Sequence, residues 1–151
     1  MDAHPIIVHF PVSLLTLYAI FELIRFRRIC EKPYWFNVKA ILAIFGFLGA
    51  AAAFATGPGQ NARSPLGEMH QHFALATLIL SGVIALHYLL RWVRQAGYHH
   101  GIPAIPSWLL VLLALALLVC ITITGGLGGA LVYGTHFDPL MAPVFKYLGV
   151  Y

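Results

Sequence analysis

Histidine is the residue type in this sequence that is best suited to chemistry, and it occurs eight times in a chain in which only 9% of the residues are charged. Imidazole binds metal ions and haem iron, and it exchanges protons near neutral pH. His9 follows Pro5 by four residues and His70 follows Pro65 by five; each proline suits the first turn of a helix, and Ser64 can cap the second of these helices. At about 1.5 Å per residue both rings lie about 6–7.5 Å inside their helices. The sequence therefore predicts two imidazoles at nearly one level.

The segments that carry these histidines have the composition of a membrane protein. Hydrophobic residues make up 60% of the 151-residue chain and charged ones 9%, whereas an ordinary soluble domain carries about 25% charged residues. This composition excludes a soluble domain and a disordered chain, and two cysteines are too few for a disulfide-stapled secreted module. A spanning helix needs about 20 apolar residues. Four long uncharged runs therefore predict an all-α, integral membrane four-helix bundle in a single domain, residues 1–151, with helices over 5–26, 38–57, 65–93 and 105–131 and a tail over 132–151.

Basic residues indicate how such a bundle is oriented. Seven of them fall on one side, between the first two helices and at the end of the third: Arg25, Arg27, Arg28, Lys32, Lys39, Arg91 and Arg94. The other side holds Arg63 and Lys146. Because basic loops stay in the cytoplasm, we expect a multi-pass protein of the bacterial inner membrane with both termini outside, on the periplasmic side. The lipid bilayer is the expected partner of the basic side, and no nucleic-acid surface is predicted.

Helical spacing predicts which face each histidine occupies. In an up-down-up-down bundle the first and third helices are diagonal neighbours, and small or hydroxyl residues favour the inward faces of membrane helices. The stripe from His9 continues through Ser13, Thr16 and Ile20, that from His70 through Ala74, Thr77 and Ser81, and that from His72 through Ala76, Ile79 and Val83. We therefore expect His9 and His70 to point inward and keep His72 as the rival of His70. The pocket beside them would be lined by Ser13, Thr16 and Thr77.

The outer halves of the two helices without a histidine at this level are built from small residues. Residues 49–57 of the second helix are mostly glycine and alanine, and the fourth helix contains Gly125, Gly126, Gly128 and Gly129. Because these helix ends carry no large side chains, they favour a narrow space beside the two imidazoles that could hold a flat macrocycle. The principal hypothesis is haem b with His9 and His70 as axial ligands, in an electron-transfer protein that is a subunit of a larger redox complex.

Other interpretations of these residues stay open. A metal site for Zn²⁺, Cu or Fe could be formed by His4, His9, Glu68, His70 and His136, and paired histidines could also hydrogen-bond a quinone. The glycines could serve only to let helices approach closely. With no cofactor bound, the chain would be an accessory subunit that stabilises a membrane complex with protein partners. The sequence shows no nucleophile with a base, no phosphate-binding loop and no paired catalytic carboxylates, so any redox activity would come through a cofactor or a partner.

Polar residues elsewhere carry smaller predictions. Arg25 follows Glu22 by three residues, which predicts a local ion pair near the cytoplasmic end of the first helix. Cys30 and Cys120 fall at different depths, so no disulfide is expected between them. The apolar and aromatic tail, residues 137–151, is expected to lie on the outer surface, where a partner or the membrane surface keeps it from fraying.

Several motifs extend over nearly the whole chain. They are HPIIVHFP at residues 4–11, Thr56-Gly57 at the end of the second helix, Glu68-Met69-His70 in the third, and GGALVY at residues 128–133 followed by His136. Together they resemble a bacterial family of four-helix membrane proteins that is classed only as a domain of unknown function. The resemblance implies the same fold and histidines and, because some members carry a fused Rieske-type or cytochrome c domain, a redox neighbourhood, but no particular activity. In that family the last histidine follows Leu-Val-Tyr after one residue and precedes a glycine. Gly134 and Thr135 intervene here, so the resemblance implies no ligand role for His136.

Overall fold

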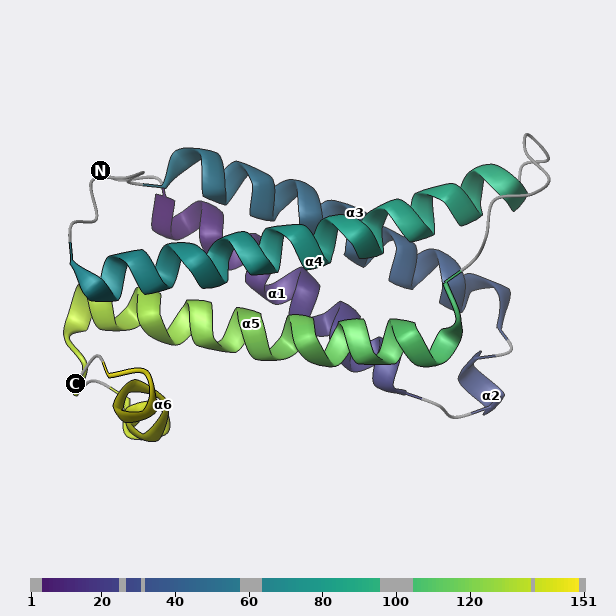
Figure 1. The fold of residues 1–151 in the computed structure, drawn as a ribbon. Helices are drawn as coiled ribbons and strands as arrows, with labels where there is room; N and C mark the ends of the chain where they lie inside the picture. Colours follow the sequence, from purple (N-terminus) through teal and green to yellow (C-terminus); the bar gives the residue numbers. More distant parts are fainter. Residues whose placement is uncertain are drawn as a thin grey trace.

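Long helices that pack side by side make up most of the described part of the protein (Figure 1). The computed structural model describes residues 4–24, 27–30, 32–57, 64–95, 105–136 and 138–149. The long helices are α1 (His4–Leu23), α3 (Pro33–Thr56), α4 (Pro65–Gln95) and α5 (Ser107–Tyr133), and two short helices are α2 (Arg27–Cys30) and α6 (Ala142–Tyr147). Each long helix is long and apolar enough to cross a membrane, and the described residues form no strand. The predicted all-α fold with four membrane spans is confirmed.

Prolines mark the starts of two spans. α3 begins at Pro33, five residues before the predicted start at residue 38, because Pro33 occupies the first turn after Lys32 in extended conformation. α4 begins at Pro65, and the Ser64 hydroxyl accepts the Gly67 N–H at 3.1 Å, as expected of a helix cap. α5 ends where Gly134 adopts a φ of 85° and donates its N–H to the Ala130 carbonyl. Such a backbone turn favours glycine over other residues.

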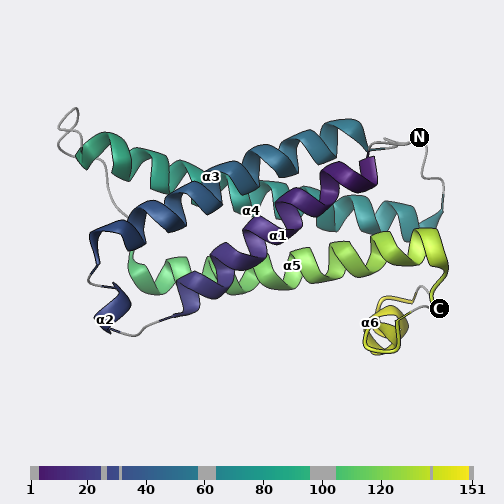
Figure 2. The ribbon, with the colours of Figure 1, turned by 180° about the vertical axis from the view of Figure 1, so that it is seen from behind.

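The long helices alternate in direction, and α1 and α4 lie diagonally across the bundle. α1 packs mainly against α3 and α5, and α4 packs mainly against the same two helices (Figure 2). We call the end where α1 and α4 begin the α6 end, because α6 lies there. The opposite end is called the basic end, because the described cations Arg28, Lys32, Lys39, Arg91 and Arg94 lie there.

The interior is packed from alanine and a few large side chains. The buried core of the bundle consists of Leu15, Tyr18, Ala19, Ala40, Ala43, Ile84, Tyr88, Ala114, Leu117 and Ile121. Small residues let α3 approach closely, and a Cβ at Gly46 would collide with the Leu15 side chain. The outer faces instead expose apolar side chains such as Phe45, Ile79 and Val119. In a protein whose helices cross a membrane, these faces contact lipid.

The tail folds back onto the bundle as α6. Phe145 is fully buried and Met141 nearly so, in a second apolar cluster with Leu127 and Ala130 of α5. Leu66, Met69 and Phe73 of α4 pack against the same cluster. Phe145 and Met141 therefore hold the tail against the chain's own α4 and α5, while Leu140 and Tyr147 stay exposed. The expectation that a partner or the membrane surface also holds the tail stays a prediction.

Candidate functional site

His9 and His70 lie at the same level near the α6 end. His9 is the fifth residue after the start of α1 at His4, and His70 is the fifth after the start of α4 at Pro65. The two helices run in the same direction, so each ring lies about 7.5 Å inside its helix. The common level predicted from the two prolines agrees with the observed helix starts.

The His70 ring is held between α4 and α5. Its Nδ1 lies 3.0 Å from the backbone carbonyl oxygen of Thr124, and a carbonyl can only accept, so Nδ1 carries the proton of this hydrogen bond. In the neutral ring the lone pair then lies on Nε2. The ring also packs against α5 where Gly128 leaves room, since a Cβ there would come within 3.2 Å of the His70 Cε1 atom.

The faces of α4 agree with the prediction from helical spacing. Thr77 and Ser81, which follow His70 on one stripe, are buried, and the Thr77 hydroxyl lies 3.3 Å from that of Thr124. His72 and Ile79, on the rival stripe, are exposed. His70 is therefore the inward histidine of this pair.

The face of α1 that carries His9 differs from the prediction. His9, Ser13 and Ile20 are exposed and Thr16 is half-buried. The buried face consists instead of Pro11, Leu15, Tyr18, Ala19 and Glu22. The expectation that His9 and Ser13 point inward is wrong: the Ser13 hydroxyl bonds to the His9 carbonyl of its own helix at 2.9 Å and needs no partner from a neighbouring helix.

The small residues at the α6 end receive side chains of the chain itself. Gly128 leaves room for His70, Gly126 for Met141 of the tail, and Gly49 for Phe10 and Pro11. Gly125 has open space beside it. Gly126 and Gly128 of α5 therefore let neighbouring side chains approach, and the imidazole of His70 is one of them.

The residues expected in the alternative metal site are not gathered in the described part of the structure. Glu68 and His136 are exposed, and the side chain of His4 lies outside the described residues. Among the residues that are described, no three of His, Cys, Asp and Glu come together as metal ligands. Cys30 and Cys120 are both free thiols, in line with the prediction.

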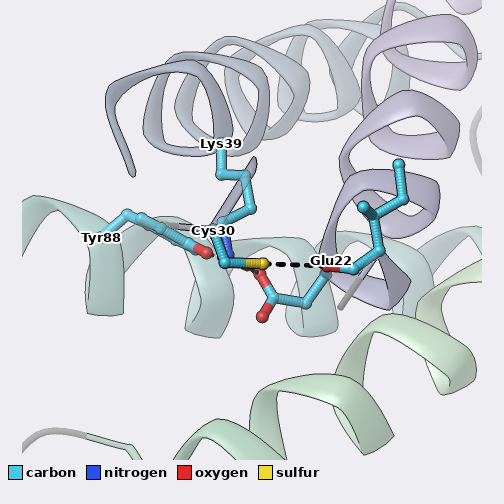
Figure 3. A network of polar contacts seen from close by, with 5 residues as sticks. Glu22, Cys30, Lys39 and Tyr88 are labelled. Carbon is cyan, nitrogen blue, oxygen red and sulfur yellow. Dashed lines mark hydrogen bonds and ion pairs between the residues drawn. The ribbon is translucent and has the colours of Figure 1, made fainter. Parts of the chain in front are cut away.

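A polar junction at the basic end joins three helices. Oε2 of Glu22, on α1, accepts hydrogen bonds from Lys39 Nζ of α3 at 2.8 Å and from the Tyr88 hydroxyl of α4 at 2.7 Å (Figure 3). Glu22 is 3% exposed and Lys39 16%. The predicted partner Arg25 lies outside the described residues. The carboxylate therefore pairs across helices, and the signal that indicates such a site is a charged residue within a span on each of two helices.

Buried donors surround this junction. The Tyr18 hydroxyl, the Trp35 Nε1–H and the His87 Nε2 are buried and have no hydrogen-bond partner within the described part of the chain. Tyr18 lies one turn from Glu22, Trp35 lies one turn from Lys39, and His87 is next to Tyr88. A buried polar group without a partner calls for water, an ion or a ligand. Among the described residues of the basic end, these three buried polar groups therefore lack a partner.

Comparison with known proteins gives one match. No curated protein and no solved structure matches the chain. A family model described as predicted membrane protein (DUF2231) matches residues 1–138, which include the four spans, both histidines and the polar junction, whereas α6 follows the matched range. The chain therefore belongs to the DUF2231 family of predicted membrane proteins.

Proposed function

We propose that this membrane protein binds haem b near the α6 end, with His70 as an axial ligand, and passes electrons as a subunit of a larger redox complex. The observation that carries the proposal is the hydrogen bond between His70 Nδ1 and the Thr124 carbonyl. Histidines that bind a metal almost always donate their other ring N–H to a carbonyl or carboxylate, which sets the tautomer and the direction of the ring. His70 has this arrangement before any ligand is added.

His9 is the proposed second ligand only because it lies at the same depth in the bundle as His70. It lies as far into α1 as His70 lies into α4, but its side chain is on the exposed face of the helix. Haem would supply one-electron redox chemistry at this level. The residues of this chain would orient the iron through His70, while Thr77 and the apolar side chains near it exclude water.

A reduced-minus-oxidised spectrum of the purified protein tests the proposal. The full chain is expressed with added haem precursor, purified in detergent and titrated with haemin. The supply of haem then does not limit binding. We expect b-type absorption bands and about one haem per chain. His70→Ala should abolish the bands, whereas His72→Ala, which changes an exposed histidine of the same helix, should leave them unchanged.

The His9→Ala variant tests the second ligand separately. With two histidine ligands the iron is six-coordinate, so loss of His9 should convert the spectrum to a five-coordinate form or release the haem. An unchanged spectrum would exclude His9 as an axial ligand and leave His70 as the proposed one. Wild-type protein without a Soret band after haemin titration would overturn the haem proposal, and bound Zn, Cu or Fe without porphyrin would favour the alternative metal site.

We also propose that the basic end faces the cytoplasm of a bacterial inner membrane, because five of the described cations lie there and, of the described cations, only Lys146 lies at the α6 end. Cys30 is exposed at the basic end, and Cys120 lies within a span. A membrane-impermeant maleimide should therefore label Cys30 in inverted vesicles and not in intact cells. Labelling in intact cells alone would reverse the orientation.

A further inference from the structure

A small hollow lies on the outside of α4 at the basic end. It has a volume of about 130 Å³ and is lined by Val83, Leu86, His87, Leu90, Arg91 and Ile105; we call it the His87 hollow. Val83 and Leu86 are exposed apolar residues on the lipid-contacting face. The hollow therefore opens toward the bilayer.

The position of His87 places the hollow at the membrane surface. The Ile105 N–H donates to His87 Nδ1 at 3.4 Å, so His87 lies level with the residues that lead into α5 at Ser107. Exposed Trp92 and Trp108 lie close to this level on α4 and α5. Tryptophan collects at the level of lipid headgroups, so the hollow spans the boundary between acyl chains and headgroups.

His87 contributes a buried donor to the hollow. Because its Nδ1 accepts the Ile105 N–H, the proton of the neutral ring is on Nε2. The side chain is 4% exposed, and Nε2 has no partner among the described residues. A buried N–H without an acceptor is costly, and no described residue of the site supplies that acceptor.

Arg91 contributes a positive charge one turn farther toward the end of α4. Its guanidinium lies 5.2 Å from the centre of the Phe36 ring, which holds it beside α3. Within the described part of the chain no carboxylate pairs with Arg91, since Glu22 is paired with Lys39 and Tyr88. A guanidinium with open donors matches the geometry of a phosphate.

We propose that the His87 hollow is a binding site for one anionic phospholipid. Along α4 the surface changes from apolar at Val83 and Leu86 to a hydrogen-bond donor at His87 and a cation at Arg91. A phospholipid changes in the same order, from acyl chain to ester carbonyl to phosphate. The acyl chain contacts the apolar residues, the ester carbonyl accepts the His87 Nε2–H, and the phosphate pairs with Arg91. The site does not depend on whether the α6 end binds haem.

Native mass spectrometry of the full chain in detergent tests the site. The protein is titrated with dioleoyl phosphatidylglycerol, with dioleoyl phosphatidylcholine, and with inorganic phosphate. We expect one phosphatidylglycerol per chain, bound about fivefold more tightly than phosphatidylcholine, since one basic residue at the membrane surface contributes about that factor. Equal binding of the two lipids, or displacement of the lipid by inorganic phosphate, would overturn the proposal.

Substitutions separate the two contacts. Arg91→Gln should remove the preference for phosphatidylglycerol, whereas Arg28→Gln, which removes an exposed cation at the same end, should retain it. His87→Leu should weaken the binding of both lipids, because both carry ester carbonyls. His87→Gln should bind them as the wild type does, because its amide places a donor near the position of Nε2. Unchanged lipid binding by Arg91→Gln would overturn the site.

If the variants do not fold, cross-linking of the wild-type protein tests the lipid site instead. Phosphatidylglycerol with a diazirine on its acyl chain should label peptides that contain residues 83–91 after illumination. Labelling that spares this segment while other lipid-contacting segments react would also overturn the proposal.

Discussion

The Tyr88 hydroxyl donates a 2.7 Å hydrogen bond to Oε2 of Glu22 and so joins α4 to α1 across the diagonal of the bundle. Lys39 of α3 binds the same oxygen at 2.8 Å. Apolar contacts between membrane helices are weakly directional, because lipid is as apolar as the side chains that it replaces. A hydrogen bond to a buried carboxylate is directional. The junction therefore specifies how α1, α3 and α4 are registered against one another.

Removal of the Tyr88 hydroxyl should destabilise the bundle. In Tyr88→Phe the ring keeps its contacts with Tyr18 and Phe36, so the change isolates the hydrogen bond. An average hydrogen bond between membrane helices contributes about 0.6 kcal/mol, and one to a charged group contributes about 1.5–3 kcal/mol. Because the acceptor is a carboxylate, we expect the free energy of unfolding in micelles to fall by about 1.5 kcal/mol.

Tyr34 supplies the matched control for this measurement. It lies at the basic end on α3 and is 58% exposed. Tyr34→Phe should change the free energy of unfolding by less than about 0.5 kcal/mol. Equal effects of the two substitutions would show that the hydroxyl of Tyr88 contributes nothing specific.

The two sides of the Glu22–Lys39 ion pair should respond differently to mutation. Lys39→Met leaves the carboxylate buried, and loss of one partner of a buried pair costs about 3 kcal/mol or more. Glu22→Gln leaves a lysine that can extend toward the headgroups of the basic end, so its effect should be nearer about 1 kcal/mol. The double variant should be more stable than Lys39→Met. Additive losses, measured by reversible unfolding in micelles, would contradict a coupled pair.

Composition and spacing correctly predict the membrane spans and the inward face of α4 that carries His70, but not the inward face of α1. Uncharged runs of helical length indicate the four spans, because the bilayer excludes charge, and Ser64 and Pro65 give the start of α4. The stripe from His70 through Thr77 and Ser81 is buried as predicted. This stripe of α4 faces α5, because the Thr77 hydroxyl lies 3.3 Å from that of Thr124 and the His70 ring bonds to the Thr124 carbonyl. The Thr77 and Ser81 hydroxyls also donate to carbonyls of α4 itself.

The same rule fails on α1, where Ser13 bonds to its own helix and Leu15 and Tyr18 take the interior. A hydroxyl residue does not by itself identify an inward face, because the Ser81 hydroxyl also bonds to its own helix and is nevertheless buried. The face that is buried depends on how the neighbouring helices pack, which one sequence does not show. The pairing of Glu22 with Lys39 is missed for a related reason. Local spacing points to Arg25, whereas the observed partner comes from a different helix.

Gly128 should be sensitive to substitution because of the His70 ring. A Cβ at Gly128 would lie 3.2 Å from Cε1 of His70, so Gly128→Ala should displace the ring and lengthen its 3.0 Å contact with the Thr124 carbonyl. Gly125→Ala is the control, since nothing lies within 4 Å of a Cβ there. Alanine gains up to about 1 kcal/mol over glycine within a helix.

We therefore expect Gly125→Ala to be neutral or stabilising and Gly128→Ala to be less stable than it by about 1 kcal/mol or more, in the range typical of overpacking. Thermal unfolding of the two proteins in the same detergent measures the difference. Equal melting temperatures would mean that the ring has room to move, and His70 would then not be held as described.

Phe145 should hold α6 against the bundle. Its side chain is fully buried beside Leu127 and Ala130, whereas Tyr147 of the same helix is 90% exposed. A buried phenylalanine contributes about 3–5 kcal/mol over alanine, more than a six-residue helix can recover from its own hydrogen bonds. Phe145→Ala should therefore release α6 while the four spans stay folded, and Tyr147→Ala should not. Hydrogen exchange distinguishes the two: the Phe145 and Leu148 amides, now bonded at 2.9 Å, should lose protection only in the first variant, and retained protection would show that Met141 alone suffices to hold the tail.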